Sequence, residues 1–139
     1  MPTTAVNLTL VVACALVDSD GRVLVAQRRQ KENDRLSGLW EFPGGKIEAG
    51  ETPEGALIRE LKEELAIDVT RACLAPLTFT SHDYETFHLL MPLYVCRKWH
   101  GTLEALVHQD LRWCPPRDLF ALAMPPADVP LIAMLRDTL

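Results

Sequence analysis

The order of apolar and polar residues predicts that the chain opens with two β-strands. Residues 8–17 and 22–28 are rich in Val, Leu and Ala, and the segment 18–21 between them has the Asp and Gly residues typical of a hairpin turn. The two strands are therefore expected to pair. The polar stretch 29–38 has no apolar periodicity, which predicts a loop.

Residues 53–65 have the pattern of an amphipathic helix. Thr52 suits the N-cap, and Pro53 fits the first helical position, where a backbone N–H is not needed. At 100° per residue the apolar side chains form one arc, and three acidic side chains lie directly beside it. These acids are Glu60, Glu63 and Glu64. The helix is expected to hold them at the edge of the core, beside a cleft.

The remaining apolar runs predict three more strands, a turn or short helix, and a C-terminal helix. In chain order these are residues 73–80, 87–97, 110–114, 115–122 and 126–139. Pro92 has no N–H to donate, so it predicts an edge strand or a bulge. Strands and helices that share one chain of 139 residues predict a single α/β domain over 1–139.

Composition and charge narrow the functional classes. A net charge of −5 works against a broad basic surface for a nucleic acid polymer. The four cysteines form no C-x-x-C pair, so a zinc knuckle or redox motif is not predicted. The longest apolar run, 8–17, is too short to span a bilayer and has no basic residue before it, so we expect a cytoplasmic protein without a membrane partner.

The acidic cluster on the predicted helix has a cost that suggests a ligand. Like charges three or four residues apart repel by roughly 0.2–0.5 kcal/mol per pair. Carboxylates at this spacing converge beside the helix, and oxygen ligands suit Mg²⁺ or Mn²⁺. The alternative is a solvated acidic face. The two glycines of "FPGGK", 42–46, let the backbone approach a ligand closely, which supports a site at this turn.

The spacing from Gly45 through Glu51 to "RELKEELAI", 59–67, resembles the Nudix box, the signature of hydrolases that cleave nucleoside diphosphates linked to another group. Ala66 departs from it where the motif has a glycine, and we expect a slightly altered helix end without loss of metal binding. The resemblance implies an α/β/α sandwich around a mixed, curved sheet. It also implies a metal site for Mg²⁺, with Mn²⁺ as a substitute. The implied ligands are the Gly45 carbonyl, Glu60, Glu64 and, with substrate, Glu63.

The resemblance implies further catalytic groups. Glu51 and Arg59 correspond to an ion pair that orients the catalytic helix, although a surface pair is the alternative. Glu60 is our first candidate for the base that takes a proton from the attacking water. The MutT type of this family often carries a loop glutamate for this role, where the present chain has Val107. Glu104 is a possible replacement, and an ordinary surface glutamate is the alternative.

Segments outside the box, such as "VAQRR" and "MPPADVPLI", resemble the MutT type. That type implies hydrolysis of 8-oxo-dGTP to the monophosphate and pyrophosphate, which protects the nucleotide pool and avoids mutation, a DNA repair role. We expect a monomer or weak dimer with a small nucleoside triphosphate as its partner. The alternatives are a CTP or broad-range pyrophosphohydrolase and, in another class, a non-catalytic nucleotide-sensing or interaction domain.

Six residues are candidates for substrate binding. Asp128 corresponds to an Asn or Asp that binds the purine edge, and helix N-capping is the equal alternative. The others are Arg29 for phosphate or base, Lys46 for phosphate, Phe42 for the pocket lining, and Tyr84 and Phe87 for stacking on the base. The alternatives are solvated side chains for Arg29 and Lys46, an anchor of the turn for Phe42, and core aromatics for Tyr84 and Phe87.

Overall fold

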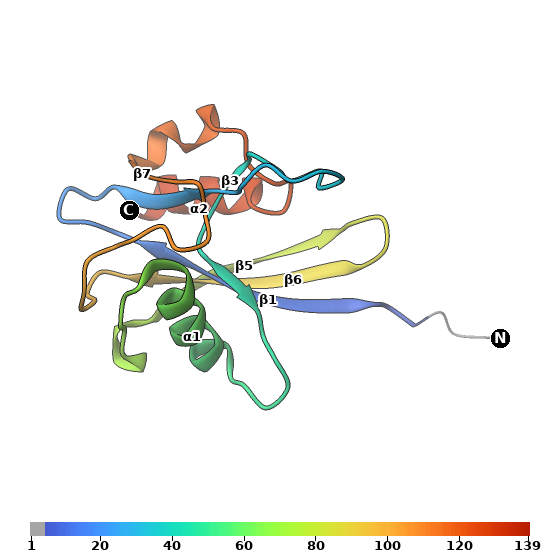
Figure 1. Cartoon of the computed structure of the whole chain (residues 1–139), viewed down its shortest axis with the longest axis horizontal. Helices are drawn as coiled ribbons and strands as arrows, with labels where there is room; N and C mark the ends of the chain where they lie inside the picture. Colours follow the sequence, from blue (N-terminus) through green and yellow to red (C-terminus); the bar gives the residue numbers. More distant parts are fainter. Residues whose placement is uncertain (1–4) are drawn as a thin grey trace.

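The structure is a computed structural model that describes residues 5–139 (Figure 1). Its described elements are, in chain order, β1 (Leu8–Leu16), β2 (Val23–Gln27), β3 (Trp40–Glu41), β4 (Gly44–Lys46), α1 (Pro53–Leu65), η1 (Arg71–Cys73), β5 (Ala75–Asp83), β6 (His88–Cys96), β7 (Asp110–Cys114), η2 (Pro116–Ala121) and α2 (Val129–Thr138). The predicted helix 53–65 and strand 110–114 are confirmed to the residue. The predicted loop 29–38 contains no helix or strand.

The strands form two sheets. The larger has the order β4-β1-β6-β5 and is mixed, because β1 runs parallel to β6 and the other pairs are antiparallel. The smaller has the antiparallel order β3-β2-β7. The predicted pairing of the first two strands is therefore wrong beyond their turn. One bridge joins Val17 to Val23, and then the strands diverge because both edges of β1 pair with β4 and β6.

Pro92 was expected in an edge strand or at a bulge. The edge position is wrong, because Pro92 lies in β6, which is an interior strand. Its parallel ladder with β1 pairs Leu10 with Leu90 and then Ala13 with Leu93. The interval without pairs contains Pro92, which has no N–H to donate, and the register is the same on both sides. The bulge of this sheet lies in β5, between Pro76 and Thr78. The sheet thus tolerates the proline by a gap in one ladder.

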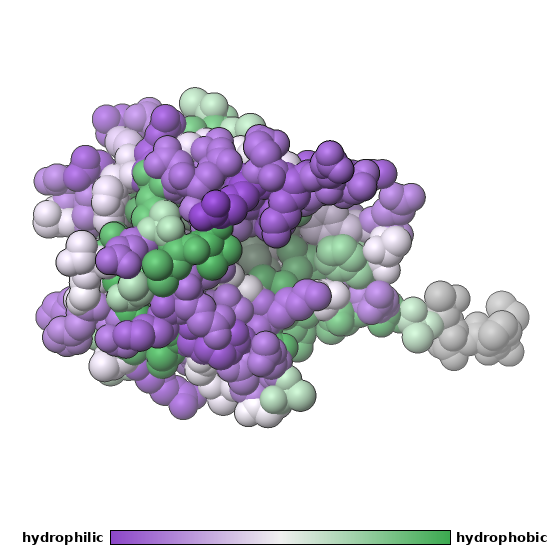
Figure 2. Space-filling model, in the orientation of Figure 1, coloured by the Kyte–Doolittle hydropathy of each residue, from purple (hydrophilic) through white to green (hydrophobic). Residues whose placement is uncertain are grey.

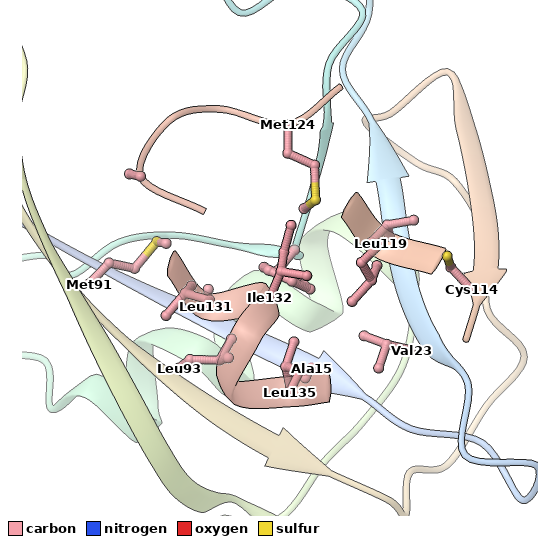
Figure 3. Close-up of a cluster of buried hydrophobic side chains, with 14 of the residues drawn as sticks. Ala15, Val23, Met91, Leu93, Cys114, Leu119, Met124, Leu131, Ile132 and Leu135 are labelled. Carbon is pink, nitrogen blue, oxygen red and sulfur yellow. The ribbon is translucent and has the colours of Figure 1, made fainter. Parts of the chain in front are cut away.

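Alternate side chains of β1 belong to two separate cores. Val12, Cys14 and Leu16 pack with the apolar face of α1, while Ala13 and Ala15 pack on the opposite side. Helix α2 covers that second side with Leu131, Ile132 and Leu135, which face the strands in Figure 3. The two helices lie on opposite sides of the larger sheet in Figure 1. The predicted α/β/α layering is confirmed, with a sheet that is split in two.

Residues 5–139 contain no helix with the length and apolar character needed to cross a membrane.

Candidate active site

Helix α1 is fixed at both ends by local interactions. The Thr52 side chain accepts a hydrogen bond of 3.1 Å from the Gly55 N–H, and Pro53 occupies the first helical position. At the other end Ala66 adopts the left-handed conformation with φ of 60°, and its N–H donates to the Lys62 carbonyl. Ala66 therefore takes the conformation that usually favours glycine, at a cost of roughly 1 kcal/mol. The acidic side chains are held on a well-defined helix.

Arg59 organises the carboxylates of α1. Its Nε and Nη2 donate to the two oxygens of Glu51 at 2.8 and 2.9 Å. This bidentate bond holds the pKa of the Glu51 carboxyl down at about 2. Nη1 donates to Glu60 at 3.0 Å and to Glu63 at 3.3 Å. The structure thus brings Glu51 and Arg59 together as a pair, with side chains that are 22% and 26% exposed and therefore only partly buried.

The glycine turn lies directly against the acids. Gly44 donates its N–H to the Glu64 carboxylate at 3.1 Å. A Cβ at Gly44 would lie 2.0 Å from the Val12 carbonyl oxygen, and a Cβ at Gly45 would lie 2.4 Å from the Glu60 carboxylate. Only glycine lets the backbone approach so closely. The turn and the helix therefore form one compact site.

Glu64 is a buried acid whose charge has little compensation from the protein. Burial and, second, the negative charge of nearby Glu60 together raise the pKa of its carboxyl to about 8, against the opposing effect of the bond from Gly44. Burial also raises the pKa of Glu60. A dication between these carboxylates would relieve the excess negative charge, and their hard oxygen atoms match the preference of Mg²⁺. The donor set fits a metal held by Glu60, Glu64 and the Gly45 carbonyl.

The three helix acids do not form a ready-made three-carboxylate site in this structure, and Glu63 is expected as a ligand only with substrate. Within residues 5–139, no three His, Cys, Asp or Glu side chains are grouped so that they can hold a metal ion. The Arg59 guanidinium hydrogen-bonds both Glu60 and Glu63, and the Glu63 side chain is 57% exposed. Arg59 thus hydrogen-bonds Glu60 and Glu63, while Glu64 is buried against the glycine turn.

A cavity of about 340 Å³ adjoins the acids. Its lining includes the candidate residues Arg29, Phe42, Gly45, Lys46, Glu64 and Asp128. Figure 2 shows a hollow on the corresponding face, with apolar residues at its base and hydrophilic residues along the rim formed near the β2–β3 connection. Arg29 donates to the Val107 carbonyl at 2.6 Å, which ties this rim to the loop before β7. The cavity combines a polar rim with an apolar floor.

Tyr84 and Phe87 do not belong to the lining of this cavity. Their rings stack on each other at 5.1 Å and pack against the core beneath α2. The Tyr84 hydroxyl accepts a hydrogen bond of 3.3 Å from the Ala127 N–H. Their alternative role as core aromatics therefore agrees with the structure.

Asp128 precedes α2 and is 6% exposed. Its side chain makes no capping hydrogen bond to the helix and instead accepts one from the Phe42 N–H. Burial and, second, the negative charge of Glu41 together raise the pKa of its carboxyl to about 7. The N-cap alternative thus lacks its hydrogen bond, and the carboxyl is one of the groups that line the cavity.

Two cavity residues that the sequence did not single out are linked to each other. The Nε2 of His108 donates to one oxygen of Glu41 at 2.9 Å, since a carboxylate only accepts. The other oxygen accepts from Arg28 at 3.2 Å, and Arg28 also binds Asp34 at 3.1 Å. The sequence carries only a weak signal that Glu41 belongs to the cavity, namely that a charged residue stands between Trp40 and Phe42.

The loop before β7 is docked on the end of α1. The N–H groups of Glu104 and Leu106 donate to the carbonyls of Leu65 and Glu64, both at 3.0 Å. Val107 lines the cavity, whereas the Glu104 side chain is exposed and outside the lining. The structure therefore does not bring Glu104 into the cavity as a replacement acid.

The helix acids that Arg59 orders against the glycine turn, at the edge of a mixed sheet between two helices, supply oxygen donors suited to a divalent metal ion. The family model described as the NUDIX domain matches residues 7–135, and the chain belongs to the Nudix family. It is therefore a Nudix hydrolase.

Known proteins with similar sequences support this assignment. A CTP pyrophosphohydrolase of Escherichia coli (strain K12) is 39% identical over 123 residues, covering 87% of this chain and 87% of that protein. An 8-oxo-dGTP diphosphatase of the same strain is 33% identical over 129 residues, covering 91% and 96%. The solution structure of the E. coli ORF135 protein has a TM-score of 0.84 and 33% identity, covering 99% and 94%.

Proposed function

We propose that the chain hydrolyses nucleoside triphosphates to the monophosphate and pyrophosphate with Mg²⁺, which Mn²⁺ can replace, and that 8-oxo-dGTP is the preferred substrate. The observation that carries this proposal is the cavity that joins Glu64 and the glycine turn at Gly45 to the buried carboxyl of Asp128. Such a cavity accommodates phosphates at the acids and a base at Asp128.

The residues around the acids have distinct roles in this proposal. Glu60, Glu64 and the Gly45 carbonyl would hold divalent metal ions, which would neutralise phosphate charge and lower the pKa of a coordinated water. Glu60, whose pKa is raised by burial, takes the proton from the attacking water, and Arg59 holds its carboxylate in place. Arg29 and Lys46 contact the phosphates from the cavity wall.

Asp128 supplies base recognition in this proposal. When ionised, its carboxylate accepts hydrogen bonds from adjacent N–H donors such as N1 and N2 of guanine. A base without matching donors would leave this buried acid without hydrogen bonds. A substrate with such a base should therefore have a much lower kcat/KM. Phe42, which is 4% exposed and donates its N–H to Asp128, forms the adjoining wall.

CTP is the second candidate substrate. It is favoured by the similarity to the E. coli protein named CTP pyrophosphohydrolase, at 39% identity. The exocyclic amine of cytosine is also an N–H donor that a carboxylate at position 128 can accept. The two candidates therefore differ in base size and not in the chemistry at the acids.

The experiment is pyrophosphate release from 8-oxo-dGTP, dGTP, dCTP and CTP with Mg²⁺, with the Glu60→Gln variant as control. We expect the highest kcat/KM for 8-oxo-dGTP and a loss of orders of magnitude in the control. Preference for CTP would favour the second candidate. Absence of release from every nucleotide would overturn the proposal in favour of a sensing or interaction domain.

In the cell, this activity would keep oxidised nucleotides out of DNA, and we propose a cytoplasmic monomer or weak dimer for this role. Deletion of the gene should then raise the mutation rate, and the Glu60→Gln variant should fail to restore it. An unchanged rate would contradict this role.

A further inference from the structure

Glu41 is held from two sides by residues that also line the cavity. Arg28 from the end of β2 and His108 from the loop before β7 each bind one of its oxygens, at 3.2 and 2.9 Å. We call Arg28, Glu41 and His108 the Glu41 clamp. His108 is 4% exposed, so its position is set by packing. The clamp gives the Glu41 carboxylate a single orientation.

The chain around Glu41 connects the two functional acids. The Phe42 N–H, next to Glu41, binds Asp128, and the Gly44 N–H binds Glu64. Two residues of extended chain span at most about 7 Å, which is roughly the distance from the base to the 5′-phosphate across a nucleotide sugar. Glu41 therefore lies beside the place where a nucleotide with its base at Asp128 and its phosphates at Glu64 has its sugar.

The bonding of Glu41 suits recognition better than proton transfer. A carboxylate has about four acceptor positions, and the clamp uses two of them. Arg28 places a positive charge 3.2 Å from the carboxylate. The side chain is still 21% exposed and lines the cavity, so it can accept another hydrogen bond. A sugar hydroxyl is the donor that a nucleotide offers at this place.

The clamp also contains buried polar atoms that are unsatisfied in this structure. The Nε of Arg28 and the Nδ1 of His108 have no hydrogen-bond partner among residues 5–139. Burying such atoms costs free energy. A purely structural clamp would be expected to satisfy them, so their retention beside the cavity points to a role for the held carboxylate.

We propose that Glu41, oriented by Arg28 and His108, accepts a hydrogen bond from the 3′-hydroxyl of the bound nucleotide. This proposal rests on the proposed function, in which the preferred substrate is a 2′-deoxynucleotide. The only free hydroxyl on the sugar of such a nucleotide is the 3′-hydroxyl. Arg28 and His108 are positioning residues, and Glu41 touches the substrate. The site thus selects nucleotides with an intact 3′-hydroxyl and rejects chain-terminating 2′,3′-dideoxynucleotides.

The test compares kcat/KM for dGTP with ddGTP, and for dCTP with ddCTP. The wild type should prefer the 3′-hydroxyl substrate by roughly ten- to hundredfold, the effect of one hydrogen bond to a charged group. In Glu41→Gln and His108→Ala the preference should fall to roughly threefold or less, and His108→Gln, which keeps a side-chain N–H, should retain most of it. Glu32→Gln, at an exposed position outside the cavity, is the matched control.

A merely structural clamp predicts a different result: the variants would lose activity equally on both sugars and keep the wild-type preference. That result, or equal rates of the wild type on both sugars, would overturn the proposal. Calorimetric binding of dGMP and ddGMP, which needs no turnover, separates it from the proposed function. If the wild type but not the variants binds dGMP more tightly than ddGMP, and no nucleotide is hydrolysed, the clamp is supported and the proposed hydrolase activity is rejected. Equal binding of the two monophosphates would reject the clamp even if triphosphates are hydrolysed.

Discussion

Replacing Glu64 with Gln should make the metal-free protein more stable while it removes activity. The side chain is 9% exposed, and in the folded chain its pKa is about 8, against 4.5 for an ordinary Glu. Between these two values the unfolded chain loses this proton while the folded chain keeps it. The free energy of unfolding therefore falls as the pH rises through this window.

The magnitude follows from the width of the window. At pH 7, about 2.5 pH units above the ordinary value of 4.5, the wild type has lost roughly 3 kcal/mol at about 1.36 kcal/mol per unit. Gln carries no charge, and its side-chain oxygen can still accept the bond from Gly44. Glu64→Gln should thus exceed the wild type by up to roughly 3 kcal/mol at pH 7 and by little near pH 4.5.

Urea unfolding with EDTA at several pH values between 4.5 and 8 measures this difference. The raised pKa of Asp128 lowers stability in the same direction, but it affects both proteins and cancels in the comparison. Glu63→Gln is the matched control, since its side chain is 57% exposed and should change stability little. Mg²⁺ should reduce the advantage by stabilising only the wild type. Parallel pH dependence of wild type and Glu64→Gln would refute the reasoning.

Three other substitutions test separate parts of the site. Arg59→Ala removes the bidentate bond to Glu51 and the bonds to the helix acids. It should lower kcat by roughly 100-fold with a smaller change in KM. Arg59→Lys should restore only part of the lost kcat. Gly45→Ala, whose Cβ would lie 2.4 Å from the Glu60 carboxylate, should raise the Mg²⁺ concentration needed for half-maximal rate by at least roughly tenfold, and an unchanged requirement would contradict the close approach. Asp128→Asn should alter the ratio of kcat/KM between 8-oxo-dGTP and CTP by roughly tenfold or more, whereas equal loss on both would remove Asp128 from base recognition.

Local sequence signals were sufficient for the catalytic helix. Thr52 and Pro53 set its start, and the apolar spacing set the face that packs on β1, so the helix was predicted at residues 53–65 as observed. The positions of Glu60 and Glu64 on that helix follow from its 3.6-residue repeat. Interactions within one or two turns depend on residues that are close in the chain, and a sequence pattern records them directly.

The strand pairing and the full site depended on contacts between distant residues. The apolar run 8–17 predicts a strand, but only the tertiary structure decides that the partners of β1 are β4 and β6 and that Pro92 lies in an interior strand. The bond between His108 and Glu41 spans 67 residues. Spacing along the chain does not record a contact between residues so far apart, because folding of the intervening segments sets its geometry. The sequence by itself thus determined the family, the helix and its acids, whereas packing alone decided that Arg59 hydrogen-bonds Glu60 and Glu63 and that Glu41 is held in the cavity.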